Sequence, residues 1–123
     1  MDRIERRIGL PVPPDEVWPA LSEGDRLSAW FGAVVSLEAR PGGRATFRWP
    51  DGRERGAVVE VAEPGRRLVF RWLPFERGPG ARTVVVGPGR VELEIEPTGT
   101  GSLLRVVEWG PGRPHPAEAV VPA

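Results

Sequence analysis

Two glutamates have the clearest potential for acid–base chemistry. Glu60 lies in the stretch VVEVAE and Glu108 in RVVEWG, and both stretches alternate like strands. A carboxylate turned toward an apolar interior would have a raised pKa and could act as a general acid or base. The alternative is a solvated or arginine-paired glutamate on the outer face, beside Arg71 or Arg105. Because buried unpaired acids are rare in proteins, the sequence favours this second interpretation.

The other residue types that carry catalysis or bind metals give weaker signals. The single histidine, His115, stands between two prolines with no acid or nucleophile beside it, which is typical of an exposed bystander. Ser28 and Ser36 have no neighbouring base. The chain has no cysteine, and no acidic stretch has the spacing of a calcium loop. Apart from the two glutamates we therefore expect no catalytic residue, and we expect no metal site and no cofactor.

Aromatic residues form the more prominent pattern. Trp30 and Phe31 stand in tandem directly before a strand-like segment, and further aromatic side chains fall at alternate positions that predict one apolar sheet face: Phe47, Trp49, Phe70, Trp72 and Trp109. Each of these, taken singly, is best interpreted as core, whereas together they could form a ligand-contacting surface. For Trp30 and Phe31 the favoured interpretation is a plug between the helices and the sheet, and the alternative is ligand contact at a cavity mouth.

Length and charge limit the classes of protein. A chain of 123 residues fits one domain, for which we take residues 1–110, followed by a proline-rich tail at 111–123. The 17 basic residues, all arginine, balance 17 acidic ones, so binding to nucleic acid or to an anionic membrane surface is not expected. Without cysteine, an apolar leader or a long apolar run, the sequence predicts a cytoplasmic protein with no membrane span.

The elements that must position these residues follow from the periodicity. Residues 3–10 predict a strand, Pro14 can open a first helix, Asp25 can cap a second, and Gly32 can end it. The rest alternates between apolar and charged residues and predicts an antiparallel sheet with one solvated face, whose segments are 35–39, 45–49, 58–61, 68–72, 91–95 and 103–109. Residues 74–89 predict a loop that holds a short strand. The fold class is α+β, with six to seven strands in all.

Five separated pieces occur in the order of a known family: PVPPDEVWPAL, WFG, RPGGR, RGAVVEVAEPGRRLVFRW and PTGTGSLLRVVEWG. In this combination residues 4–110 resemble the START-like SRPBCC superfamily, and within it the branch named after the activator of heat-shock protein 90 ATPase. The resemblance implies a helix-grip, Bet v 1-like fold, in which a curved sheet wraps a long C-terminal helix and leaves an apolar cavity. Only GPGRPHPAEAVVPA follows Trp109, so we expect that helix to be absent or vestigial.

The resemblance leaves three functions open. The working hypothesis is non-catalytic binding of a small hydrophobic molecule in the cavity, completed where necessary by self-association. The alternative is a protein–protein interaction module, associated with a chaperone or a regulator, and the third is a cyclase or hydrolase of a small apolar substrate. Because two short helices are too small to cover the apolar sheet face, we expect a homodimer or a protein partner to cover it.

Overall fold

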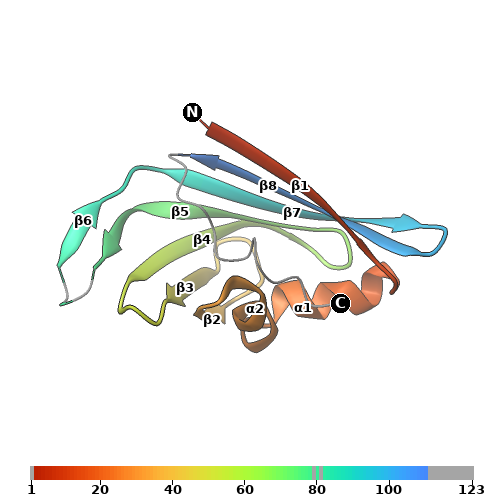
Figure 1. The fold of residues 1–123 in the computed structure, drawn as a ribbon, viewed down its shortest axis with the longest axis horizontal. Coiled ribbons are helices and arrows are strands. Elements are labelled where there is room, and N and C mark those ends of the chain that lie inside the picture. Colours follow the sequence, from red (N-terminus) through yellow and green to blue (C-terminus); the bar gives the residue numbers. More distant parts are fainter. Residues whose placement is uncertain (1, 79, 81, 111–123) are drawn as a thin grey trace.

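The computed structural model describes residues 2–78, 80 and 82–110. Within them the chain forms two helices and a strongly curled antiparallel sheet, which confirms the predicted helix-grip class (Figure 1). The expected proline-rich tail at 111–123, where we expected the long helix to be absent or vestigial, and His115 lie outside the described residues. No helix in the described part of the chain is long and apolar enough to cross a membrane.

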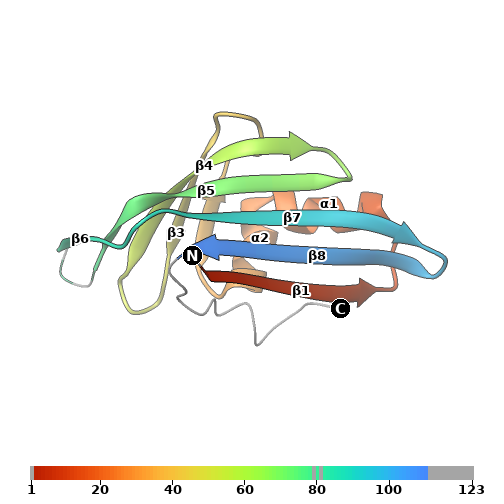
Figure 2. The ribbon, with the colours of Figure 1, turned by 90° about the horizontal axis from the view of Figure 1, so that it is seen from above.

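In the sheet, the first and last strands of the described chain, β1 and β8, pair with each other. Its main path runs β1-β8-β7-β5-β4-β3-β2, and the short strand β6 pairs with β5 off this path (Figure 2). The strands are β1 Asp2–Leu10, β2 Val34–Leu37, β3 Arg44–Arg48, β4 Glu54–Glu63, β5 Arg67–Arg77, β6 Thr83–Val85, β7 Gly89–Thr98 and β8 Gly101–Gly110. The expected short strand in 74–89 is thus confirmed as β6, and it brings the number of strands described to eight.

Two short helices lie on the concave side of the sheet (Figure 1). α1 spans Pro14–Ser22 and begins with proline in its first turn, where no helical N–H is lost. α2 spans Gly24–Phe31 and ends at Gly32, whose φ of 67° is the left-handed conformation that closes a helix. The start signal of α1 and the stop signal of α2 were both legible in the sequence, and Gly32 leaves Trp30 and Phe31 in the last turn of α2, facing the sheet.

The core lies between the helices and the concave face. Its sheet side includes the predicted alternating residues Val35, Ala45, Phe47, Trp49, Val59, Leu68, Phe70, Trp72, Val91, Leu93 and Ile95, and its helix side includes Val17, Leu21, Leu27, Trp30 and Phe31. Because one side chain in two points inward along each strand, the charged residues between them form the convex face.

The prediction for β8 was wrong by one residue. Leu104 and Val106 face the core, whereas Trp109 lies on the convex face, paired in register with Arg3 and Arg90. The guanidinium groups of those two arginines lie 5.8 and 5.4 Å from the Trp109 ring centre. The segment LLRVVEW carries apolar residues on both faces, so its periodicity left the orientation open, and pairing with β1 and β7 decided it.

Candidate functional site: a cavity beside the helices

A cavity of about 680 Å³ lies between the two helices and the β1–β8 side of the sheet. Its apolar lining consists of Leu10, Val12, Val17, Pro19, Ala20, Leu21, Ala29, Trp30 and Leu104, and its polar lining of Asp15, Glu16 and Arg26. The volume falls within the roughly 300–1,000 Å³ of small-molecule sites. Mostly apolar walls with a few charged groups suit an apolar molecule that carries a polar part.

Each part of the cavity wall follows from a local sequence pattern. Val17 and Leu21 are one helical turn apart, so α1 turns both toward the sheet, where they are 3% and 2% exposed. Leu104 contributes the floor from β8 and is also buried. Asp15 and Glu16 belong to the first turn of α1, where carboxylates complement the positive helix end. Both acids are exposed, so the charged groups lie at the rim of the cavity.

Trp30 is the one predicted ligand-contacting residue that lines this cavity. Its ring meets Phe31 edge-on, with 5.0 Å between ring centres. Phe31 turns the other way, into the core, where its ring centre lies 5.3 Å from that of Phe47 and 6.4 Å from that of Phe70. The tandem pair therefore serves two surfaces: Phe31 plugs the helices onto the sheet, and Trp30 forms a cavity wall.

Four of the other predicted aromatic residues, Phe47, Trp49, Phe70 and Trp72, form a packed cluster. The ring centre of Phe47 lies 4.7 Å from that of Trp72, 5.5 Å from that of Phe70 and 6.1 Å from that of Trp49. Phe47 and Phe70 are fully buried, while Trp49 and Trp72 are 8% and 6% exposed. This placement matches the interpretation of each residue as core, and none of the four lines the cavity described above.

The two candidate glutamates take opposite faces. Glu60 is exposed on the convex face, with its carboxylate 3.2 Å from Arg90 and 3.7 Å from Arg71, so it is the arginine-paired glutamate that the sequence favours. Glu108 is half-buried and stands in register between Ile4 and Val91, which places it on the concave face, contrary to the expectation of an outer position. The two carboxylates therefore cannot act on one substrate.

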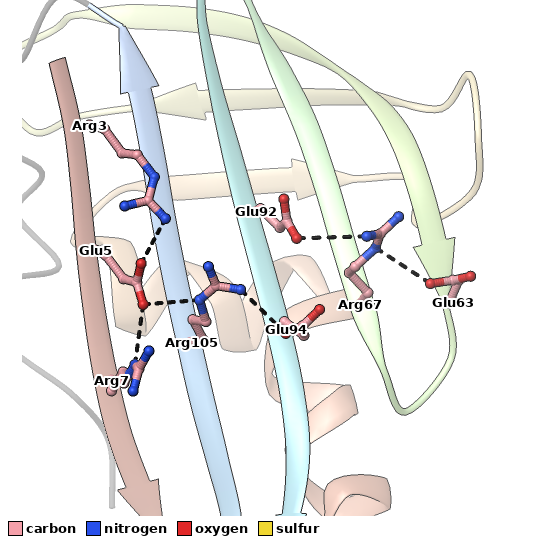
Figure 3. A network of polar contacts seen from close by, with 8 residues as sticks. All are labelled: Arg3, Glu5, Arg7, Glu63, Arg67, Glu92, Glu94 and Arg105. Carbon is pink, nitrogen blue, oxygen red and sulfur yellow. Dashed lines mark hydrogen bonds and ion pairs between the residues drawn. The ribbon is translucent and has the colours of Figure 1, made fainter.

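The convex face carries an ion-pair network (Figure 3). The Glu5 carboxylate lies 2.7 Å from the guanidinium of Arg3, 3.0 Å from that of Arg105 and 3.2 Å from that of Arg7. The Arg105 guanidinium also lies 3.6 Å from the Glu94 carboxylate. Hydrogen bonds from Arg105, and then from Arg3, lower the pKa of Glu5 from 4.5 to about 2. Val107, which is 1% exposed, stands in register with Glu5 on β1 and Glu92 on β7.

A polar cluster that the sequence analysis missed lies at the opposite end of the sheet from the cavity. The Arg55 guanidinium lies 4.9 Å from the Trp72 ring centre and donates to the carbonyls of Leu73 and Gly87. The Arg53 guanidinium lies 5.1 Å from the Trp49 ring centre and 3.7 Å from the carboxylate of Glu76, a residue that is 4% exposed. Arg55 of β4 stands directly opposite Phe47 of β3, so both side chains lie on the inner face of the sheet. A correct prediction of this strand pairing would have placed Arg55 there. Within the described residues no three His, Cys, Asp or Glu side chains converge to hold a metal ion.

Comparisons with known proteins add a family and a set of structures. A family model described as Activator of Hsp90 ATPase homolog 1-like protein matches residues 11–121. Protein MLL2253 from Mesorhizobium loti has a TM-score of 0.75 at 22% identity, with 92% of this chain and 79% of that chain covered. The Aha1 dimer from Colwellia psychrerythraea has a TM-score of 0.70 at 19% identity, with 97% and 84% covered.

A third solved structure is that of DynU16, described as a protein in the dynemicin biosynthetic locus. It has a TM-score of 0.72 at 28% identity, and the match covers 93% of this chain but only 39% of that chain. Comparison with curated proteins gives no match.

Proposed function

Because the chain belongs to the Activator of Hsp90 ATPase homolog 1-like family, whose fold serves as a ligand-binding or interaction module, we propose that it binds a small hydrophobic molecule without catalysis. The observation that carries this proposal is the cavity of about 680 Å³ between the helices and the β1–β8 side of the sheet. The ligand lies against Trp30 and Leu104, and its polar part lies at the rim near Asp15, Glu16 and Arg26.

Two further observations support a binding role. DynU16, at 28% identity, is described as part of a biosynthetic locus, which agrees with a small organic molecule as ligand. The cavity lining includes two acids, Asp15 and Glu16, and both are exposed to water at its rim. The chemistry available in the lining is therefore that of binding and orientation.

Filling the cavity tests this function. Ala29 lines the cavity from an exposed position on α2, so Ala29→Phe adds a ring there without disturbing the buried core. We expect binding of the neutral fluorescent probe N-phenyl-1-naphthylamine to weaken at least tenfold in this variant. The matched control is Val34→Phe, which adds the same ring at a position 68% exposed and outside the cavity lining.

Two results of this probe-binding experiment would contradict small-molecule binding in the cavity. A wild-type chain that does not bind the probe, or an Ala29→Phe variant that binds it as well as Val34→Phe does, would contradict the proposal. Native mass spectrometry of the chain as purified adds an independent reading, because a retained apolar compound released by Ala29→Phe identifies the natural class of ligand.

A second candidate is association with another copy of the chain. It is favoured by the Colwellia psychrerythraea relative, which is described as a dimer and covers 97% of this chain. Sedimentation equilibrium across a concentration range measures the molar mass directly. A mass of 13.4 kDa at all concentrations would rule this candidate out, and a rise toward twice that value would support it.

A further inference from the structure

β6 extends the sheet beyond its main body. It lies at one end of the molecule, past the ends of β7 and β8, in both views of the ribbon (Figures 1 and 2). We use the name "arm" for this end, made of residues 44–58, 73–78 and 82–85, which include β3, the start of β4, the end of β5 and β6. The arm is separate from the cavity, whose lining contains none of its residues.

One backbone edge of β6 has no partner strand among the described residues. On the β5 side, the N–H of Val86 donates to Pro74 at 3.0 Å, and the carbonyl of Arg82 accepts from Gly78 at 2.6 Å. Because hydrogen-bonding direction alternates along a strand, Thr83 and Val85 point their N–H and C=O groups away from β5. No strand in the described part of the chain pairs with that side. These groups can therefore accept a further strand.

The side chains of this edge are apolar and exposed. Val85 is 86% exposed, and its cross-strand partner Phe75 is 47% exposed. Val84, on the other face, is 41% exposed. Sheet edges are usually protected by charges, proline or covering loops, yet the three residues of β6 carry no charge and no proline. Within the described residues, the strand itself therefore carries no side chain that would discourage strand addition.

A shallow groove adjoins this edge on the convex face. Its volume is about 350 Å³, and its lining includes Gly56, Leu73, Phe75 and Thr83. Gly56 has no side chain there, and a Cβ at that position would meet Leu73 at 3.0 Å. A side chain from an added strand can therefore pack against Phe75 next to the open backbone groups.

The arm is positively charged although the whole chain is neutral. It contains six arginines and three carboxylates. Glu54 is bound by Arg48 at 3.3 Å, and Glu76 is buried beside Arg53. The remaining arginines near the groove and the edge are Arg44, Arg77 and Arg82, and none of them forms an ion pair with a carboxylate of the described residues. An acidic partner would supply the missing charges.

We propose that β6 binds an extended segment of another protein, in which apolar residues alternate with acidic ones, by adding it to the sheet as a strand. The backbone of Thr83 and Val85 provides the hydrogen bonds, and Phe75 and Val85 provide apolar contacts. The arginines of the arm select acidic over basic segments. This interaction uses a surface separate from the cavity, so it holds or fails independently of small-molecule binding.

Two synthetic peptides test the charge and backbone requirements. Both are nine residues long, capped and labelled with fluorescein; one alternates valine with glutamate and the other valine with lysine. We expect fluorescence anisotropy to show binding of the glutamate peptide, at least tenfold tighter than that of the lysine peptide and weaker at higher salt. Failure of the glutamate peptide to bind, or equal binding of both peptides, would overturn the proposal.

Val85→Pro isolates the role of the strand edge. Proline removes the outward N–H of residue 85 and leaves the β5 hydrogen bonds in place, because proline is tolerated on sheet edges. We expect at least tenfold weaker peptide binding with an unchanged circular dichroism spectrum, whereas Val85→Thr, which keeps the N–H, retains binding. Wild-type affinity in Val85→Pro would refute strand addition.

Two further tests ask whether the charge of the arm matters and whether a second copy of the chain binds the edge instead. Arg77→Gln should weaken binding of the glutamate peptide, whereas Arg66→Gln, a change at an exposed arginine in the turn between β4 and β5, should not. Equal effects of both changes would contradict recognition by the arm. If the wild type dimerises and Val85→Pro is monomeric, the edge binds a second copy of this chain and the proposed acidic partner is wrong.

Discussion

At the scale of single residues, Phe47 and Glu5 have the most sharply defined surroundings. Phe47 is fully buried at the centre of an aromatic cluster, in contact with Phe31, Phe70 and Trp72. Glu5 is held on the convex face by three arginines (Figure 3). The first residue stabilises the fold through packing and the second through charge, so they respond to different experiments.

Replacing Phe47 by alanine should lower the free energy of unfolding by about 3–5 kcal/mol, because it removes a large buried ring and leaves a cavity among neighbours that relax only in part. Urea denaturation at pH 7 measures the change. Phe75→Ala is the matched control, since Phe75 is 47% exposed and its removal leaves no enclosed space. Equal losses in the two variants would show that the aromatic cluster is not the tightly packed core described.

The Glu5 carboxyl makes stability depend on pH in a predictable direction. Hydrogen bonds from the arginines lower its pKa from 4.5 to about 2, so its contribution is complete above about pH 5 and is lost as the pH falls from 4.5 toward 2. Wild type should therefore be more stable than Glu5→Gln at neutral pH, and the two should converge in acid.

Urea denaturation at a series of pH values measures the difference between wild type and Glu5→Gln. The control variant is Glu96→Gln, which removes an exposed carboxylate that forms no ion pair with the other described residues. A difference that grows as the pH falls would mean that the arginines do not stabilise the charged form of Glu5.

At the scale of elements, irregularities in β4 and β5 shape the arm. The register shifts between Arg55 and Ala57, so that Leu73, Pro74 and Phe75 of β5 stand opposite a single residue of β4. Such a bulge bends and twists the strands. Arg55 fixes this bend by donating to the Leu73 carbonyl at 3.3 and 3.2 Å and to the Gly87 carbonyl at 3.0 Å.

Arg55→Lys should loosen the arm without unfolding the sheet, because an ammonium group cannot reproduce the planar fork that reaches both carbonyls. We expect hydrogen exchange of the Val84 amide, which faces β5, to accelerate about tenfold, equivalent to about 1.4 kcal/mol. The Leu93 amide in the centre of the sheet is the internal control. Uniform acceleration at both amides would indicate global destabilisation and contradict a local role for Arg55.

At the scale of the whole molecule, one core connects the helices to most of the sheet. Trp30 from α2, Trp49 after β3 and Trp72 from β5 all belong to it. The first and last described strands pair with each other, and the Glu5–Arg105 ion pair joins residues that are distant in sequence. Apart from β6, whose residues are all exposed, no element can separate from this arrangement without exposing the shared core. The elements that share the core should therefore unfold in one cooperative step.

Coincident transitions test this cooperativity. Tryptophan fluorescence, which reports the core, and far-ultraviolet circular dichroism, which reports the strands and helices, should give the same urea midpoint and the same slope. A fluorescence transition at lower urea than the circular dichroism transition would show that the aromatic cluster loosens before the sheet does.

The sequence by itself determined the order and type of the elements. Proline at the start of α1, Gly32 at the end of α2 and the alternation in β3 and β5 are local signals, because they depend on backbone conformations and side-chain periods within a few residues. The family could also be assigned from separated short pieces, and the match over residues 11–121 confirms it.

Only the tertiary structure decided the facing of β8, the position of the cavity and the open edge of β6. The apolar residues of β8 allow either face until pairing with β1 and β7 selects one. The cavity needs Leu10 and Val17, near the start of the chain, to meet Leu104, which most of the chain separates from them. Periodicity within one segment carries no information about which neighbours it will have, so long-range packing had to place Trp30 at the cavity and Phe47 in the core.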